Sequence, residues 1–132
     1  MSVAAGPARR VLVVEDDPDI GRLILLLLRR AGLDGTLRSD GDSGLRAVAE
    51  LRPDLLVLDV ELPGLDGWRV LEQVRADDAD TGTGARLPVL LLSAHAQDAD
   101  QARGRQLGAD DFVLKPFQNA DLVTRLRRLL PA

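Results

Sequence analysis

An unbroken apolar run at residues 55–58, with the sequence LLVL, ends on the carboxylate of Asp59. A run of this length favours a β-strand that is covered on both faces, as the strands of parallel sheets are. Pro63 and Gly64 then indicate a loop, and an amphipathic segment begins near Trp68. Because ligands of open α/β sheets bind where the strands end, Asp59 is the first candidate for a functional residue.

The rest of the chain alternates between short strand patterns and helical patterns. Predicted strands cover residues 11–14, 33–38, 55–59, 89–92 and 111–114. Helical periodicity follows each of them, over residues 18–31, 42–51, from 68, 97–107 and from 119. Five βα units with right-handed crossovers predict a single α/β domain, a three-layer doubly wound five-stranded parallel sheet of the form (βα)5.

Local signals place several element ends. Asp17 and Pro18 fit the N-cap and the first position of the first helix, and Asn119 is expected to cap the last helix. The helix at 97–107 has few large apolar residues and contains Gly104, which costs about 1 kcal/mol against Ala. We expect this helix to be the least stable of the five.

The polar segment 76–87 is predicted to be a loop. Three of its carboxylates resemble metal ligands, namely Asp77, Asp78 and Asp80. A helix-to-strand loop lies at the amino ends of the strands, away from Asp59, so a solvated loop is the preferred interpretation.

Composition limits the compartment and the class of partner. The chain has no Cys, so it has neither a disulfide nor a thiolate metal site, which suits a reducing compartment. No signal-peptide apolar region is present, and the apolar run at 23–28 is too short to cross a bilayer. A net charge of −4 argues against nonspecific nucleic-acid binding. We therefore expect a cytoplasmic protein without membrane or direct nucleic-acid contact.

Polar groups follow four of the predicted strands at their carboxyl ends. They are Glu15, Asp16 and Asp17 after the first, Asp59 on the third, Ser93 after the fourth and Lys115, the sole lysine, after the fifth. Clustered carboxylates repel one another unless a cation joins them, and oxygen ligands favour Mg²⁺. A lysine and a hydroxyl beside such an ion would hold phosphoryl oxygens, and a carboxylate can form an aspartyl phosphate. Four unrelated polar strand ends are the alternative, which the coincidence disfavours.

Four stretches of the chain resemble the CheY-like receiver domains of two-component response regulators. They are VLVVEDDPDI (11–20), RPDLLVLDVELPGLDGW (52–68), VLLLSA (89–94) and GADDFVLKPF (108–117). The resemblance implies the flavodoxin-like strand order 2-1-3-4-5. It also implies a tail at residues 1–10 and a receiver domain at 11–130, with no output domain expected after it. Whether the chain is a single-domain regulator or an excised receiver stays open.

The resemblance implies a role for each site residue. Asp59 corresponds to the phosphoacceptor, which takes its phosphoryl group from a histidine kinase or a histidine phosphotransferase. The Mg²⁺ ligands would be Glu15 through water, Asp16 directly, Asp59, and the backbone carbonyl of Glu61. Lys115 would pair with the phosphoryl group, and the Lys115–Pro116 bond would be cis.

The resemblance also implies a switch. Ser93 would contact the phosphoryl group, and Phe112 stands where the aromatic switch residue of the family is often Tyr. Their movement would reshape the face of the fourth helix, fifth strand and fifth helix, for a downstream protein or a homodimer formed on phosphorylation. Glu61 and His95 occupy positions that tune the phosphoryl lifetime in similar proteins; alternatively, His95 is an exposed side chain with no role.

Leu25 and Leu26 lie outside the apolar stripe of the first helix. They are either simple surface leucines or a docking patch for a kinase.

Competing interpretations fit less well. A haloacid-dehalogenase-like phosphatase would carry its nucleophile on the first strand and needs a cap segment, and Asp59-Val60-Glu61 only approximates its Asp-x-Asp signature. A pseudo-receiver that only binds partners would not need the Asp16, Asp59 and Lys115 set. The GDSG sequence at 41–44 resembles a serine-protease motif, but it opens a helix and is read as chance. We expect a signalling switch rather than an enzyme.

Overall fold

A single parallel sheet forms the centre of the molecule in the computed structural model, which describes residues 8–80, 82, 84–95 and 98–130. Within this part of the chain the strand order is β2-β1-β3-β4-β5. The strands are β1 (Arg10–Val14), β2 (Asp34–Arg38), β3 (Leu55–Asp59), β4 (Val89–Ser93) and β5 (Asp111–Leu114). The predicted doubly wound topology is confirmed. Most of the predicted N-terminal tail lies outside the described residues, and Arg10 already belongs to β1.

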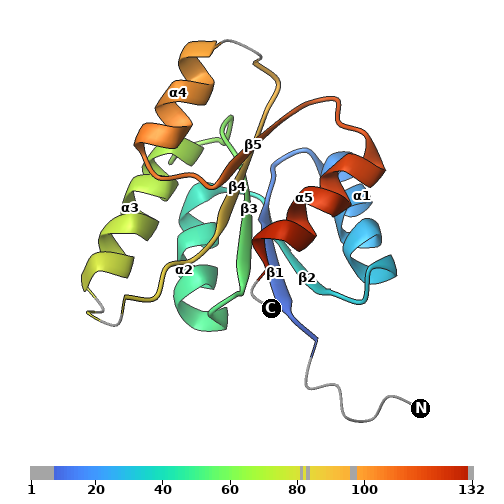
Figure 1. Ribbon diagram of the computed structural model, residues 1–132, viewed down its shortest axis with the longest axis horizontal. Helices are drawn as coiled ribbons and strands as arrows, with labels where there is room; N and C mark the ends of the chain where they lie inside the picture. Colours follow the sequence, from blue (N-terminus) through green and yellow to red (C-terminus); the bar gives the residue numbers. More distant parts are fainter. Residues whose placement is uncertain (1–7, 81, 83, 96–97, 131–132) are drawn as a thin grey trace.

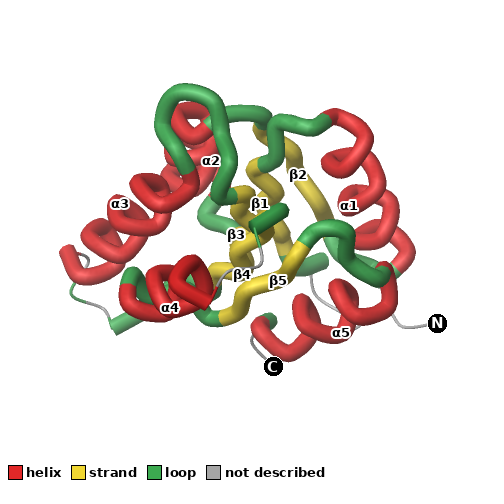
Figure 2. Tube along the Cα trace, turned by 90° about the horizontal axis from the view of Figure 1, so that it is seen from above, coloured by secondary structure: helices red, strands yellow, loops and turns green. Residues whose placement is uncertain are grey.

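Five helices cover the two faces of this sheet (Figure 1). They are α1 (Pro18–Arg30), α2 (Gly41–Leu51), α3 (Gly67–Asp80), α4 (Asp98–Gln106) and α5 (Asn119–Leu129). Seen from above, α1 and α5 lie on one side of the strands and α2, α3 and α4 on the other (Figure 2). The three-layer arrangement therefore places every helix against the sheet, as the alternating pattern predicts.

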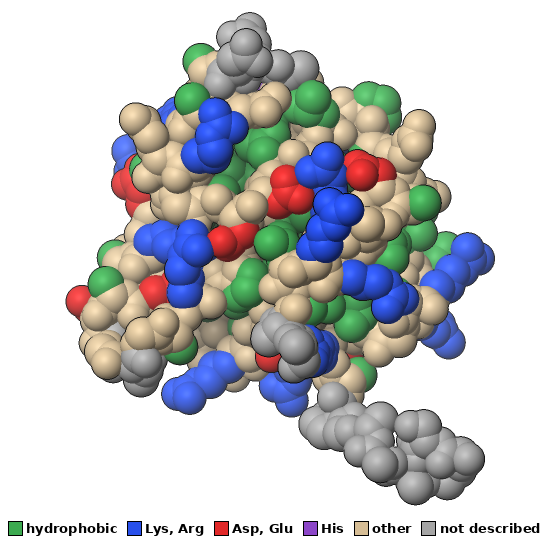
Figure 3. Space-filling view, in the orientation of Figure 1, with side chains coloured by type: hydrophobic (Ala, Val, Ile, Leu, Met, Phe, Trp, Pro, Cys, Tyr) green, Lys and Arg blue, Asp and Glu red, His purple; other side chains and the backbone are tan. Residues whose placement is uncertain are grey.

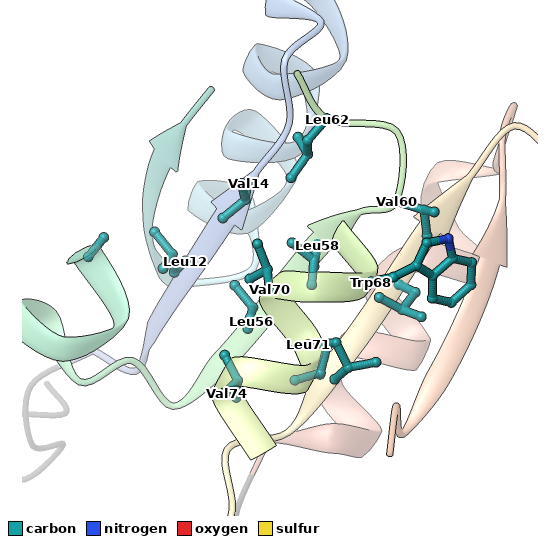
Figure 4. Packing of buried hydrophobic residues seen from close by; sticks show 13 residues of the cluster. Leu12, Val14, Leu56, Leu58, Val60, Leu62, Trp68, Val70, Leu71 and Val74 are labelled. Atoms are coloured by element: carbon teal, nitrogen blue, oxygen red, sulfur yellow. The ribbon is translucent and has the colours of Figure 1, made fainter. Parts of the chain in front are cut away.

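Alternate residues of the strands supply two separate cores. Val11 and Val13 face α1 and α5, whereas Leu12 and Val14 face the side of α2 and α3. All five positions of β3 and of β4 are buried, which explains their unbroken apolar sequences. Figure 4 shows the second core, in which residues of α3 such as Leu71 pack on the central strands. Each fully buried Leu contributes roughly 1.5–3 kcal/mol to folding.

The start of α1 is fixed by its predicted cap. The Asp17 carboxylate accepts hydrogen bonds from the backbone N–H groups of Asp19 and Ile20, and Pro18 occupies the first helical position. Of the two leucines predicted to lie outside the apolar stripe, Leu26 is 43% exposed. Leu25 is half-buried and packs against the core on the α1 side of the sheet, so the prediction was wrong for Leu25.

The segment 76–80 is helical, so the prediction that 76–87 is entirely loop was wrong. α3 runs to Asp80, and side-chain pairs stabilise its last turns despite their polarity. Arg75 pairs with Asp78 at 2.8 Å, and Gln73 donates to Asp77 at 2.9 Å. Arg75 also donates to the backbone carbonyl of Leu87 at 2.6 Å, which ties the end of α3 to the approach to β4.

Asn119 is the first residue of α5 rather than its N-cap, so this prediction was also wrong. The N-cap is Gln118, whose side chain makes no capping hydrogen bond. The reason is that helical hydrogen bonding begins one residue earlier than expected, because the N–H of Leu122 already donates to the carbonyl of Gln118. The buried positions of α5 are Leu122 and Leu126, which the apolar spacing predicts.

The buried contact of α4 with the sheet is made at its glycine. Gly104 is buried, and a Cβ added there would lie 3.1 Å from Leu91 Cδ1 and 3.4 Å from Phe112 Cδ2. The glycine therefore weakens the helix but allows its backbone to approach β4 and β5 closely. No helix among the described residues combines the length and the apolar content needed to cross a bilayer.

Candidate functional site

An open cleft of about 560 Å³ lies where the strands of the sheet end. Its lining includes six of the predicted site residues, namely Glu15, Asp16, Asp59, Glu61, His95 and Lys115. These residues come from the ends of β1, β3, β4 and β5, which are adjacent only because the sheet is parallel and in this order.

Asp59 is buried at the last position of β3 and is held on both oxygens. Its Oδ2 accepts a hydrogen bond from Lys115 Nζ at 3.0 Å, and its Oδ1 accepts one from the backbone N–H of Glu61 at 3.0 Å. Lys115 also forms an ion pair with Glu15, with Nζ 2.6 Å from Oε1. The lysine therefore joins the carboxylate at the end of β3 to the one that follows β1.

This arrangement places more negative than positive charge in a small, partly buried volume. The pKa of Asp59 is raised to about 8, chiefly by burial and then by its neighbours Glu15 and Glu61, against the lowering effect of Lys115. Burial lowers the pKa of Lys115, but the hydrogen bonds and charges of Glu15 and Asp59 outweigh burial, so the net pKa lies above its ordinary value. Protonated Lys115 alone does not balance the surrounding carboxylates.

The acidic residues fit a hard divalent cation. Glu15, Asp16 and Asp59 each offer a carboxylate oxygen, and these oxygens all lie within 4.8 Å of one another. Glu15 and Asp59 are buried while Asp16 is exposed, so the cluster is open to solvent on one side. An all-oxygen set with an open side suits Mg²⁺, which keeps several of its waters. Asp17, although adjacent in sequence, uses its carboxylate to cap α1.

Ser93 lies at the end of β4 with its hydroxyl turned toward Glu61. Its Oγ donates to Glu61 Oε1 at 3.0 Å and accepts from the backbone N–H of His95 at 3.0 Å. Burial raises the pKa of Glu61, but hydrogen bonds with Asp59, Ser93 and backbone N–H groups outweigh burial, so its net pKa is lowered. The sequence indicated a backbone role and a lifetime role for Glu61, but not that its carboxylate would bridge β3 and β4.

The remaining predicted residues lie around this cluster. The His95 ring is 67% exposed, with Nε2 3.3 Å from Glu61 Oε1. Phe112 is half-buried on β5 and packs against the core beneath α3. The Lys115–Pro116 peptide bond is cis, as predicted. The metal-ligand role of the Glu61 carbonyl stays a prediction.

One contact near the site was missed in the sequence. The Arg103 guanidinium of α4 lies over the ring of Trp68, 4.6 Å from its centroid. Arg103 is one of many arginines in the chain and stands 35 residues from the single tryptophan, so no periodic pattern could have indicated this pair.

Known proteins resemble this chain in both sequence and fold. The DNA-binding response regulator MtrA of Mycolicibacterium smegmatis is 41% identical over 122 residues, which cover 92% of this chain and 50% of MtrA. The BeF3-activated N-terminal receiver domain of RstA from Klebsiella pneumoniae superposes with a TM-score of 0.85 at 31% identity, covering 94% of this chain and 100% of that one.

A further structural neighbour contains a metal. The receiver domain of a sensor histidine kinase from Pseudomonas aeruginosa, described with a magnesium ion coordinated in its active site cleft, superposes with a TM-score of 0.80 at 34% identity. The match covers 92% of this chain and 97% of that one. The chain spans about half the length of the curated relatives that it matches. The model of the response regulator receiver domain matches residues 11–127, and the chain belongs to this family of two-component signalling domains.

Proposed function

We propose that Asp59 is the phosphoacceptor of a two-component phosphorelay. The observation that carries the proposal is the position of its carboxylate, which is buried at the end of β3 and contacts the sole lysine of the chain at 3.0 Å. An Asp59 oxygen attacks the phosphorus of a phosphohistidine on a histidine kinase or histidine phosphotransferase. The P–N bond breaks, the imidazole keeps the electron pair, and an acyl phosphate forms on Asp59.

The acidic residues would hold Mg²⁺, with Asp16, Asp59 and the backbone carbonyl of Glu61 as direct ligands and Glu15 acting through a water molecule. When bound, Mg²⁺ supplies positive charge that stabilises the ionised carboxylate and the transferring phosphoryl oxygens. Asp59 needs this positive charge because its pKa is raised, and a protonated carboxyl is not a nucleophile. The acidic cluster therefore both needs the cation and offers it ligands.

Lys115 and Ser93 act on the phosphoryl group itself. Lys115 already contacts Asp59, so its ammonium group is placed to pair with an oxygen of the phosphoryl group that forms there. Ser93 lies on the neighbouring strand, and its hydroxyl is a second donor for a phosphoryl oxygen. The added charge would draw Ser93 toward Asp59 and allow the Phe112 ring to follow.

We propose that the signal leaves through the face formed by α4, β5 and α5. Figures 1 and 2 place these elements on one side of the molecule, which Figure 3 shows as a surface where acidic, basic and hydrophobic side chains are interspersed. Phe112 is a half-buried residue of β5, one of the three elements of this face. Movement of the Phe112 ring would favour binding of a downstream protein or of a second copy of the chain to this face.

The boundaries and the output of the whole protein stay proposals. We place the receiver at residues 11–130 and regard it as a signalling switch that catalyses only its own phosphorylation and dephosphorylation. The relative MtrA is named as a DNA-binding regulator and is about twice as long as the matched region. DNA binding is therefore a property of MtrA and is not assigned to this chain. Within the residues described, we assign no nucleic-acid contact, and Leu26 on α1 remains the candidate for kinase docking.

The test is incubation with Mg²⁺ and acetyl phosphate, followed by intact mass measurement. We expect one phosphoryl adduct on the wild type, none on Asp59→Asn, and loss of labelling when EDTA is present. An adduct on Asp59→Asn would move the acceptor to another residue. A wild type that takes no adduct from acetyl phosphate or from any phosphorylated kinase would instead indicate a domain that only binds partners.

A further inference from the structure

The Glu61 carboxylate is the acceptor for the donors at the end of β4. A single oxygen, Oε1, accepts from Ser93 Oγ at 3.0 Å and from the backbone N–H of Ala94 at 3.3 Å. The His95 ring nitrogen lies 3.3 Å from the same oxygen. Glu61 itself follows the end of β3, so its side chain crosses from the acceptor strand to the neighbouring strand.

These donors are the ones that an anion bound at Asp59 would use. A hydroxyl and a backbone N–H at adjacent positions form a small anion-binding arrangement, suited to one carboxylate oxygen or one phosphoryl oxygen. The backbone N–H of Glu61 donates to Asp59 Oδ1 at 3.0 Å, which keeps the two carboxylates side by side. The Ser93 hydroxyl and the Ala94 N–H are therefore donors that either the Glu61 carboxylate or a phosphoryl group on Asp59 could use.

The hydrogen bonds that Glu61 Oε1 accepts from Ser93 and Ala94 hold the side chain only weakly in place. The second oxygen of Glu61, Oε2, is buried, and no N–H or hydroxyl group of the described residues donates to it; the Asp59 carboxyl beside it can do so only while protonated. A buried carboxylate oxygen without a partner reduces the net stabilisation that the Oε1 contacts provide. The side chain as a whole is 36% exposed, so solvent lies beside it and the group has room to leave.

We propose that Glu61 is a resident competitor of the phosphoryl group, occupying the Ser93 and Ala94 donors until phosphorylation displaces its carboxylate. The proposal rests on Asp59 being the phosphoacceptor and adds a step to that function. Release of the Glu61 side chain accompanies formation of the acyl phosphate, and the Ser93 hydroxyl exchanges one anionic oxygen for another. The resting protein therefore holds Ser93 with an internal anion.

Three substitutions separate occupancy of the donors from the effect of charge. Glu61→Ala removes both the charge and the reach of the side chain. Glu61→Asp keeps the charge but is one methylene shorter and cannot reach Ser93 from the same backbone position. Glu61→Gln keeps the reach and an acceptor oxygen but loses the charge. If Glu61 competes for the donors, Glu61→Asp should bind a phosphoryl mimic as tightly as Glu61→Ala. If charge repulsion alone acts, Glu61→Gln should bind it as tightly as Glu61→Ala.

The first experiment measures the affinity for beryllofluoride, a reversible mimic of the phosphoryl group, at a Mg²⁺ concentration that saturates every variant. We expect Glu61→Ala and Glu61→Asp to bind roughly tenfold more tightly than the wild type, the size of one or two net hydrogen bonds. Glu61→Gln should stay within about threefold of the wild type. The control is Glu72→Ala, an exposed carboxylate on α3, which should not change the affinity.

The second experiment needs no metal. The Ala94 amide proton of the wild type should resonate downfield because it donates to a carboxylate, and it should move upfield in Glu61→Ala and Glu61→Asp. Equal beryllofluoride affinities in all variants, an unshifted Ala94 amide, or a Gln variant that matches the Ala variant would overturn the competition. If even the wild type binds no beryllofluoride, the assignment of Asp59 as phosphoacceptor fails instead, so the two failures are distinguishable.

Discussion

The Arg103 guanidinium lies 4.6 Å from the centroid of the Trp68 ring and joins α4 to α3. This contact matters because α4 carries almost no large apolar side chains, and Gly104 is its buried position among the described residues. Trp68 itself is buried in the core beneath α3, as its ring beside Val60 in Figure 4 shows. A helix with so few apolar contacts depends more than the others on individual side-chain contacts.

Arg103→Ala should loosen α4 without unfolding the domain. A cation–π contact near the surface contributes about 0.5–1 kcal/mol, which corresponds to roughly two- to fivefold faster opening of this helix. Amide hydrogen exchange across residues 98–106 measures that opening. Arg105→Ala removes the same charge from the same helix and serves as the control; equal exchange in both variants would argue against the ring contact.

Gly104→Ala should destabilise the domain, although alanine is the better helix former by about 1 kcal/mol. The new Cβ would lie 3.1 Å from Leu91 Cδ1, inside ordinary contact distance, and Leu91 is fully buried in β4. Crowding in a packed core costs about 1–3 kcal/mol, which equals or exceeds the gain in propensity. Urea denaturation checks the sign, and a more stable variant would show that α4 can shift outward freely.

The stability of the metal-free protein should fall as the pH rises toward 8. The pKa of Asp59 is raised from 3.8 to about 8 by burial and by neighbouring carboxylates, so the folded state binds its proton more tightly than the unfolded state. Stability from this group is therefore present at low pH and lost as the pH rises from about 4 through 8. Asp59→Asn should stabilise the metal-free fold more at pH 8 than at pH 5.

Thermal unfolding at both pH values, with and without Mg²⁺, tests this pH dependence. Saturating Mg²⁺ should reduce the difference between wild type and Asp59→Asn, because a cation favours the ionised carboxylate. A constant difference across the pH range would mean that Asp59 titrates near its ordinary pKa.

Asp16→Asn should weaken Mg²⁺ binding roughly tenfold while leaving the metal-free stability nearly unchanged. The reason is that Asp16 is exposed, whereas its oxygen lies within the 4.8 Å cluster with Glu15 and Asp59. Titration of Mg²⁺ by calorimetry gives the affinity. Asp17→Asn makes the same change in charge one residue along and keeps a good N-cap residue for α1, so a smaller effect is expected there.

His95→Ala should shorten the lifetime of the phosphorylated protein by a few-fold. The ring lies at the open side of the cleft, 3.3 Å from the Glu61 carboxylate, and its removal gives water more access to Asp59. The decay of the phosphoryl adduct, followed by intact mass after the phosphodonor is removed, measures the lifetime. An unchanged decay rate would support the alternative that His95 has no role.

Much of the site follows from the sequence because topology brings strand ends together without detailed packing. Once the alternating pattern requires a parallel sheet, residues that end different strands meet at one edge. Glu15, Asp59 and Lys115 are therefore neighbours because each stands at the carboxyl end of its own strand, which the local sequence pattern predicts. The cap at Asp17 is equally local, since its donors are two and three residues away.

Other features depend on partners that are distant in sequence. α3 extends to Asp80 although its end is polar, because Arg75 pairs with Asp78 and bonds to the backbone near β4. Leu25 is half-buried because β2 presents Gly35 beneath it, with the Leu25 side chain 2.8 Å from where a Cβ would stand. Polarity and helical spacing alone therefore gave wrong predictions at these positions.

The sequence by itself determined the order of the elements, the edge of the sheet at which the polar groups gather, and which carboxylates meet the lysine there. Only the tertiary structure decided where the Glu61 carboxylate lies and that Arg103 covers Trp68. Backbone elements follow from periodic burial, which is repeated along the chain. The rotamer of a single side chain depends on donors and rings that folding brings from elsewhere, and no local pattern records them.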